Sequence, residues 1–183
     1  MTTPHAVAAQ TNDTIVLILM GVSGAGKTTV GTLLAEALGW EFVDGDDFHP
    51  DANRKKMEQG IPLTDEDRWP WLRAIRDYIH ERLSAGAPAV IACSALKAAY
   101  REVLLDGNDG AKIVYLKGSH DLIRRRLESR TDHFFDPELL RSQFEALEEP
   151  GSEAALTVNV DASPDAIVRT IRRELTVLPH PSE

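Results

Sequence analysis

Eight residues near the start of the chain have the types and spacing needed to bind a polyphosphate. Gly21-Val-Ser-Gly-Ala-Gly-Lys-Thr28 matches the pattern G-x-x-x-x-G-K-[ST] at every defined position. Glycines let the backbone wrap around phosphates with its N–H groups pointing inward, while the lysine reaches the β- and γ-phosphates and the threonine offers a hydroxyl to Mg²⁺. The motif predicts an ATP site at Gly21, Val22, Ser23, Gly24, Ala25, Gly26, Lys27, Thr28 and Thr29.

A glycine-rich turn that merely links a strand to a helix is the alternative interpretation of this motif. The required context is present, because a branched apolar run at 15–20 precedes the motif and a helical pattern at 27–38 follows it. Many proteins with this loop hold Mg²⁺ with an acid at the end of a second apolar strand. Here the apolar strand at 87–93 ends in Cys93-Ser-Ala-Leu-Lys97, without an acid. We therefore expect Thr28 and Asp44 to be the metal ligands.

A second cluster of polar residues, Asp44-Gly-Asp-Asp-Phe-His-Pro50, follows a short strand at 41–44. An enzyme that phosphorylates a hydroxyl needs a carboxylate within hydrogen-bond reach, which orients the hydroxyl and accepts its proton. Asp46 is our candidate for this catalytic role. For Asp47 and Asp51, the favoured interpretation is that they cap the helix that follows Pro50.

Strand and helix patterns alternate along the chain. Strands are expected at 15–20, 41–44, 87–93, 112–116 and 156–160, with helical patterns between and after them. This alternation indicates βαβ units, and therefore a three-layer α/β/α fold with a parallel five-stranded sheet. The expected organisation is a single domain at 14–177 between flexible tails at 1–13 and 178–183. Within it we expect a helical substrate-binding insertion at about 47–85 and a lid at about 124–137.

The composition excludes several classes of protein. The chain has 183 residues, of which 43% are apolar, and a net charge of −9, which argues against a nucleic-acid partner. No apolar run approaches the roughly 18 residues that cross a bilayer, and no signal peptide is recognisable. The single cysteine, Cys93, fits a reducing compartment. We expect a cytoplasmic enzyme that binds small anionic ligands and has no membrane partner.

Beyond these two clusters, further segments give the chain a resemblance to the P-loop gluconokinases, which are related to shikimate and nucleoside-monophosphate kinases. The resemblance covers about residues 15–175, nearly the whole chain. The P-loop itself is shared by many enzymes, whereas Ser94-Ala-Leu-Lys97 with Tyr100-Arg101, and Ser142-Gln-Phe144, are far more specific. Other segments that carry it are Asn53-Arg-Lys-Lys-Met57, Gly60-Ile-Pro-Leu63, Asp65-Glu-Asp-Arg-Trp-Pro-Trp-Leu72, His133-Phe134 and Leu147-Glu-Glu-Pro150.

The resemblance implies transfer of the γ-phosphoryl group of ATP to the 6-hydroxyl of D-gluconate, which gives 6-phosphogluconate and ADP. It also implies a P-loop NTPase fold and a homodimer. The positions that it assigns to the substrate are Asp46, His49, Arg68, Lys97, Arg101, His133 and Gln143. Arginines suit the gluconate carboxylate because they bind it bidentately. In the lid, Arg130 is expected to act catalytically on the phosphates and Arg126 to contact the adenine or phosphates.

Other interpretations stay open at this point. Arg68 could pair with Asp65 or Glu66 at the surface, and Lys97 and Arg101 could form a solvated stripe on one helix face. The acceptor could be shikimate, a nucleoside or another sugar acid. A different class of protein, a nucleotide-binding switch without turnover, would not require Asp46, His49 and Arg101 together. The lid also departs from the family pattern, with Asp132 and Phe135 where Gly and Met are usual.

Overall fold

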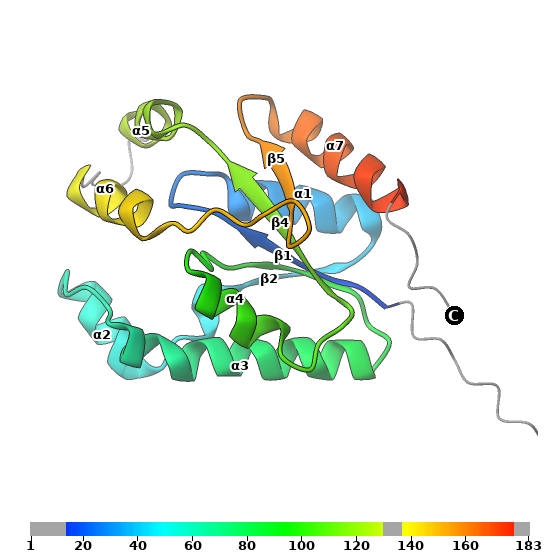
Figure 1. Cartoon of the computed structure of the whole chain (residues 1–183), viewed down its shortest axis with the longest axis horizontal. Coiled ribbons are helices and arrows are strands. Elements are labelled where there is room, and N and C mark those ends of the chain that lie inside the picture. The colour runs from blue at the N-terminus through cyan, green and yellow to red at the C-terminus, as the bar shows by residue number, and fades with distance from the viewer. Residues whose placement is uncertain (1–13, 130–136, 178–183) are drawn as a thin grey trace, which may run out of the picture.

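The sheet is fully parallel. The computed structural model describes residues 14–129 and 137–177. Its five strands lie in the order β2-β3-β1-β4-β5, and every neighbouring pair runs in the same direction (Figure 1). Their bounds are β1 (Val16–Met20), β2 (Glu41–Asp44), β3 (Ala89–Ala92), β4 (Ala111–Lys117) and β5 (Leu156–Asn159). The expected α/β class and five-stranded parallel sheet are thereby confirmed.

Strand β1 lies at the centre of the sheet, where side chains are buried on both faces. All five of its residues are buried, which explains the uninterrupted apolar run in the sequence. Ile18 lies opposite Ile91 of β3 on one side and Ile113 of β4 on the other. The carboxyl ends of β1, β2 and β3 therefore reach the same edge of the sheet, where the phosphate-binding motif and the acidic cluster begin.

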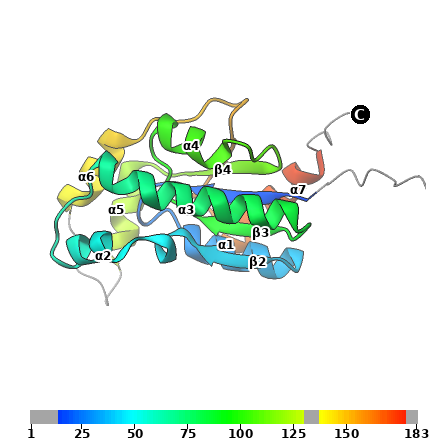
Figure 2. The same cartoon turned by 90° about the horizontal axis from the view of Figure 1, so that it is seen from below.

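Helices cover both faces of the sheet (Figures 1 and 2). One core cluster includes Leu17 and Leu34 and is covered by α1 and α7, while the other includes Ile18 and Ile75 and is covered by α3 and α4. The helical elements are α1 (Lys27–Leu38), the 3-10 helix η1 (Gly45–Phe48), α2 (Asp51–Glu58), α3 (Asp65–Ser84), α4 (Ala98–Leu105), α5 (His120–Glu128), α6 (Pro137–Ala146) and α7 (Pro164–Val177). None of the helices in the described ranges is long and apolar enough to cross a membrane.

The segment after β3 differs from the sequence-based expectation. The strand ends at Ala92, and α4 begins at Ala98 rather than near Leu96. Between them Ala95 adopts a left-handed conformation with φ 44°, which is uncommon for a residue other than glycine. Lys97 is extended and precedes the first turn of α4. The intervening loop, residues 93–97, therefore turns sharply at the edge of the sheet instead of entering the helix directly.

The predicted insertion and lid correspond to particular helices, although their roles stay predictions. Helices α2 and α3 occupy 51–84, and α3 is the longest helix of the described chain. Its start is fixed by a capping box, in which the Thr64 hydroxyl accepts from the Asp67 backbone and the Asp67 carboxylate accepts from the Thr64 backbone. Most of the predicted lid loop, residues 130–136, lies outside the described residues.

Candidate active site

The phosphate-binding motif forms a loop between β1 and α1. Gly24 and Gly26 have φ angles of 82° and 95°, which only glycine adopts without strain. A Cβ at Gly24 would also lie 2.8 Å from Leu127 Cγ of α5, so this glycine lets α5 approach the loop. Lys27 Nζ donates to the carbonyl oxygens of Gly21 and Val22 at 2.9 and 3.1 Å. The lysine is thereby held over the loop, at the N-terminus of α1, where anions are favoured.

Thr28 and Asp44 bring two hard oxygen donors together. Thr28 Oγ1 lies 3.4 Å from Asp44 Oδ2, across the gap between the start of α1 and the end of β2. The other carboxylate oxygen, Asp44 Oδ1, accepts from the Asp46 backbone N–H at 3.1 Å and so fixes the carboxylate in place. A hydroxyl and a carboxylate next to a polyphosphate loop suit Mg²⁺, which prefers oxygen ligands and takes the remainder from phosphates and water.

Asp46 is held at the carboxyl end of β2 by the residue before it. A Cβ at Gly45 would lie 2.5 Å from the carbonyl oxygen of Ala92, so only glycine lets η1 pack this closely on β3. The Gly45 carbonyl accepts from Trp71 Nε1 at 2.7 Å, which ties η1 to α3. Desolvation by the surrounding protein and the nearby Asp44 carboxylate raise the pKa of Asp46, while Lys27 acts to lower it. Lys27, Asp44 and Asp46 therefore share one electrostatic environment.

His49 is buried beside Asp46. Its ring stacks on Trp71 with centroids 4.2 Å apart, and its Nε2 lies 3.9 Å from Asp46 Oδ1. On the other side of the ring, Nδ1 lies 3.3 Å from Asn53 Nδ2. Burial, with help from the cationic Arg68 and Arg54, lowers the pKa of His49 to about 4, so the ring is neutral at physiological pH.

Lys97 has a partner that the sequence did not indicate. Its Nζ donates to both carboxylate oxygens of Asp65 at 2.8 Å, and Tyr100 Oη donates to the same carboxylate at 2.5 Å. The hydrogen bonds from Lys97 and Tyr100 lower the pKa of Asp65. Asp65 therefore joins α3 to the loop that leads into α4.

Arg68 lies one turn along α3 from Asp65. Its guanidinium sits 6.0 Å from the centre of the Tyr100 ring. Among the residues that the structure describes, no carboxylate forms an ion pair with Arg68, so the surface pair with Asp65 or Glu66 that we considered is not formed. Its charge acts on Asp46, His49, Asp65 and Tyr100. Arg68 is thus a half-buried cation beside Tyr100 whose charge reaches Asp46 and His49.

Arg101 is buried, which contradicts the alternative of a solvated stripe with Lys97. The residue is only 7% exposed, and its Nη1 donates to the carbonyl oxygens of Ala95 and Leu96 at 3.0 Å each. Lys97 precedes α4 rather than lying on it, so the two residues do not share a helix face. Arg101 therefore supports the loop at 93–97. That it also contacts the substrate stays a prediction.

The same loop is tied to the phosphate-binding motif and to the segment after α6. Gly21 N–H donates to the Ser94 carbonyl at 3.2 Å. The Glu148 backbone N–H donates to the Leu96 carbonyl at 2.9 Å, and its carboxylate accepts from the Ala98 backbone at 2.6 Å. Cys93 lies at the base of the loop, where burial raises the pKa of its thiol to about 12.

The lid-side candidates have different positions. Gln143 of α6 accepts from the Ser23 backbone N–H through Oε1 at 2.7 Å, so it meets the phosphate-binding loop rather than the Asp46 side. Arg126 of α5 donates to the Val160 carbonyl, just after β5. Arg130 and His133, like Asp132 and Phe135, lie outside the described residues, and their roles stay predictions.

Three contributors to this region were not singled out from the sequence for the roles that they take. They are Asn53 beside His49, Asp65 beside Lys97, and Trp71 beneath His49 and Gly45. The capping signal Thr64-x-x-Asp67 could have placed Asp65 on the first turn of α3. No sequence signal pairs Asp65 with a lysine 32 positions away, because that contact depends on how α3 and α4 pack.

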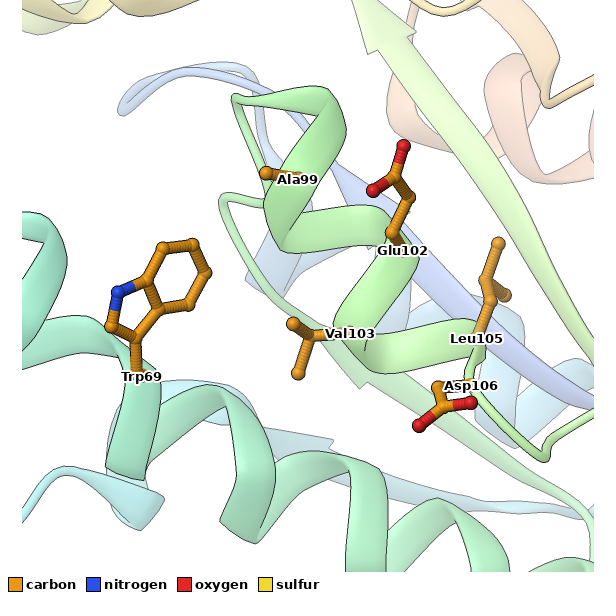
Figure 3. A pocket seen from close by; sticks show the side chains of 6 residues that line it. All are labelled: Trp69, Ala99, Glu102, Val103, Leu105 and Asp106. Atoms are coloured by element: carbon orange, nitrogen blue, oxygen red, sulfur yellow. The ribbon is translucent and has the colours of Figure 1, made fainter.

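A shallow groove lies to the side of this region, between α3 and α4. Trp69 faces α4 across it, with Ala99, Val103 and Leu105 along the apolar wall and the carboxylates of Glu102 and Asp106 nearby (Figure 3). Trp69 also packs edge-on against Tyr100, with ring centroids 5.5 Å apart. The indole therefore belongs to the packing between the two helices, and the groove holds none of the residues that gather around Asp46.

Comparison with known proteins identifies the family. An AAA domain family model matches residues 16–150. A probable gluconokinase from Mus musculus is 46% identical over 87% of this chain and 97% of its own length. The chain belongs to the gluconokinase family. The thermoresistant gluconokinase of Escherichia coli K12 is 42% identical over 86% of this chain and 91% of its own.

A solved structure of another family member agrees with the fold described above. The crystal structure of a gluconokinase from Sinorhizobium meliloti 1021 superposes with a TM-score of 0.78, at 42% identity. The match covers 91% of this chain and 98% of that one. The overall fold is thus that of a kinase of this family.

Proposed function

We propose that this protein phosphorylates the 6-hydroxyl of D-gluconate with ATP, producing 6-phospho-D-gluconate and ADP. The similarity to gluconokinases over nearly their full length supports this reaction. The observation that carries the proposal is the position of Asp46. Its backbone N–H donates to the carboxylate of Asp44, which contacts Thr28, and its carboxyl lies within the electrostatic influence of Lys27. The carboxylate that would orient the acceptor thus lies next to the residues that would hold the nucleotide.

The nucleotide side of the site would use backbone amides and Lys27. The N–H groups of the loop and the N-terminus of α1 suit the phosphates, and Lys27 would neutralise charge on the β- and γ-phosphates. Thr28 and Asp44 would hold Mg²⁺, which neutralises phosphate charge when it is bound. In the structure Lys27 Nζ binds the Gly21 and Val22 carbonyls, which an incoming phosphate would replace as its partner.

On the acceptor side, Asp46 would orient the 6-hydroxyl and accept its proton as the phosphoryl group transfers in line. His49 would donate a hydrogen bond to the substrate from a fixed, buried ring. The pKa of Asp46 is raised, which makes its carboxylate a better proton acceptor than an ordinary aspartate.

Arg68 is the side chain best placed to bind the gluconate carboxylate. Its charge reaches Asp46 and His49, and a guanidinium can bind a carboxylate through two parallel hydrogen bonds. Lys97 already binds the Asp65 carboxylate, so its ammonium is partly neutralised. In this proposal, Lys97 contacts substrate hydroxyls and Arg101 maintains the loop beneath it.

The remaining assignments also belong to the proposal. Arg126 and Arg130 would bind ATP, with Arg130 acting on the transferring phosphate, while His133 and Gln143 would reach the substrate when the lid closes. A cytoplasmic location and a homodimer remain what the family resemblance implies.

A panel of acceptors tests the proposed function. ADP release in a coupled assay should be fast with D-gluconate, slow with other aldonates, and at background with shikimate and nucleosides. Gluconate should also raise the melting temperature further in the presence of a non-hydrolysable ATP analogue than in its absence. Fast turnover of shikimate or a nucleoside would show that this compound, and not gluconate, is the acceptor. If none of the acceptors on the panel led to ADP release, the result would contradict a kinase function and favour the nucleotide switch.

A further inference from the structure

Asn53 is a buried polar residue to which the reaction described above gives no role. It lies on α2, is 3% exposed, and does not border the nucleotide loop. Its Nδ2 donates to the Asp67 carbonyl of α3 at 2.7 Å. A carbonyl oxygen only accepts, so the amide orientation is fixed, because the flipped amide would place two oxygens against each other. The same Nδ2 lies 3.3 Å from Nδ1 of His49.

This orientation determines which nitrogen of His49 carries the proton. One hydrogen of the Asn53 amide serves the Asp67 carbonyl, and the other is available to Nδ1. Because an amide nitrogen donates and does not accept, Nδ1 is the acceptor in this contact and carries no proton. In a neutral ring the proton then resides on Nε2, the nitrogen that lies 3.9 Å from Asp46 Oδ1. The low pKa of His49, about 4, agrees with a ring that stays neutral.

The surroundings hold the ring in this position. Trp71 stacks on one face at 4.2 Å with an interplanar angle of 13°. Arg54 Nε donates to the His49 carbonyl at 2.9 Å and Nη2 donates to the Asp47 carbonyl at 2.6 Å, so the backbone is clamped as well. The charged groups whose influence reaches the ring are Asp46 of η1, Arg54 of α2 and Arg68 of α3. Both arginines oppose a second proton on the ring.

The tautomer matters because of the spacing between His49 and Asp46. At 3.9 Å, one oxygen atom can lie within hydrogen-bond distance of both Nε2 and Oδ1. Such a hydroxyl oxygen would accept from Nε2–H and donate its own proton to Asp46. A bare Nε2 would instead compete with Asp46 for the hydroxyl proton, and the alcohol would have two acceptors and no donor.

We propose that Asn53 is a positioning residue that locks His49 in the Nε2–H tautomer, so that a substrate hydroxyl is held between the Nε2–H donor and the Asp46 acceptor. The part that concerns the substrate rests on the proposed sugar-acid kinase function. The tautomer itself does not.

Nitrogen NMR of the full chain, labelled with ¹⁵N-histidine, tests the tautomer directly. His49 is one of six histidines and is assigned from the signals that disappear in His49→Gln. In the unsubstituted protein at pH 7, we expect Nε2 to have the chemical shift of a protonated nitrogen and Nδ1 that of a bare one. In Asn53→Ala the two forms should mix, and in Asn53→Asp the proton should move toward Nδ1, because a carboxylate accepts and does not donate.

Kinetics test the consequence for the acceptor. Asn53→Ala should lower kcat/KM for gluconate roughly tenfold, the effect of one neutral hydrogen bond, and leave KM for ATP unchanged. Asn108→Ala is the matched control, because Asn108 is 1% exposed and donates to the carbonyls of Arg76 and Leu104 far from His49. It should lower the melting temperature comparably without changing the kinetics or the histidine spectrum.

Several results would overturn the proposal. One is a protonated Nδ1 in the unsubstituted protein, which decides the question even if no Asn53 variant folds. Another is an Asn53→Ala spectrum in which His49 keeps the unsubstituted tautomer. A third is an equal loss of kcat/KM in Asn53→Ala and Asn108→Ala. Failure of gluconate as a substrate would leave the NMR result standing, so it is distinguishable from failure of the tautomer lock.

Discussion

The two sides of the active site are built in different ways. On the proposed nucleotide side, the phosphate-binding loop is one continuous segment whose backbone N–H groups, glycine conformations and single lysine would provide most of the binding surface. The acceptor side is assembled from η1, α2, α3 and the loop after β3, and it depends on side chains that bind one another. A binding site formed by backbone groups tolerates little change in backbone geometry, but all of its groups come from neighbouring residues in the sequence. A site made of paired side chains depends on the packing of distant elements, so single substitutions there should separate acceptor effects from nucleotide effects.

The largest expected effect comes from Asp46. Asp46→Asn should lower kcat about 10³-fold, since the amide cannot accept the hydroxyl proton. Binding of a non-hydrolysable ATP analogue, measured by calorimetry, should be kept or slightly strengthened, because a negative charge near Lys27 is removed. Asp47→Asn, an exposed neighbour on the same 3-10 helix, is the control and should turn over normally. Near-normal turnover of Asp46→Asn would remove this residue from catalysis.

Replacing Arg68 should affect gluconate alone. Arg68→Ala should raise KM for gluconate about 50-fold, the loss expected for a charged hydrogen-bonded contact, with KM for ATP unchanged. The KM of Arg68→Lys for gluconate should lie between those of the unsubstituted protein and Arg68→Ala, because lysine keeps the charge and loses the bidentate geometry. Arg73→Ala, an exposed position on the same helix, serves as the control. Equal increases in KM for gluconate and for ATP would show that Arg68 does not belong to the acceptor side alone.

The stability of the acceptor side should depend on pH through His49. The folded pKa of about 4 lies below the ordinary value of 6.5, so the folded state binds fewer protons between these values. This contribution to the free energy of unfolding is therefore complete above pH 6.5 and is lost as pH falls toward 4, by roughly 3 kcal/mol at most. Denaturant unfolding of His49→Gln should show a weaker pH dependence in this window. His80→Gln, exposed on α3, should retain it, and identical curves for the two variants would contradict the assignment.

The smallest effect is expected where α6 meets the nucleotide loop. Gln143 Oε1 accepts from the Ser23 N–H, a donor that a phosphate would use. Gln143→Ala should therefore lower KM for ATP about two- to threefold, since no side-chain acceptor competes for this donor. Ser142→Ala, which removes only a bond to the Leu139 carbonyl within α6, should have no effect. A higher KM for ATP in Gln143→Ala would indicate that the glutamine binds the ligand instead.

The same contrast explains what the sequence could predict. The phosphate-binding loop and the five strands were predictable because glycine spacing and short apolar runs are local signals. The path of residues 93–97 was not, because Ala95 adopts a left-handed conformation that favours glycine. The burial of Arg101 and the pairing of Lys97 with Asp65 were missed for a related reason. Arg101 binds the carbonyls of this turned loop, and the pairing of Lys97 with Asp65 depends on how α3 packs against it.

The buried cysteine has a practical consequence. Burial raises the pKa of the Cys93 thiol to about 12, so little of it is ionised at pH 7, and oxidants and alkylating reagents react with the thiolate. The chain contains no other cysteine. A fluorophore or spin label attached to a cysteine introduced on α2 or α6 would therefore report from that position alone, without removing the native thiol.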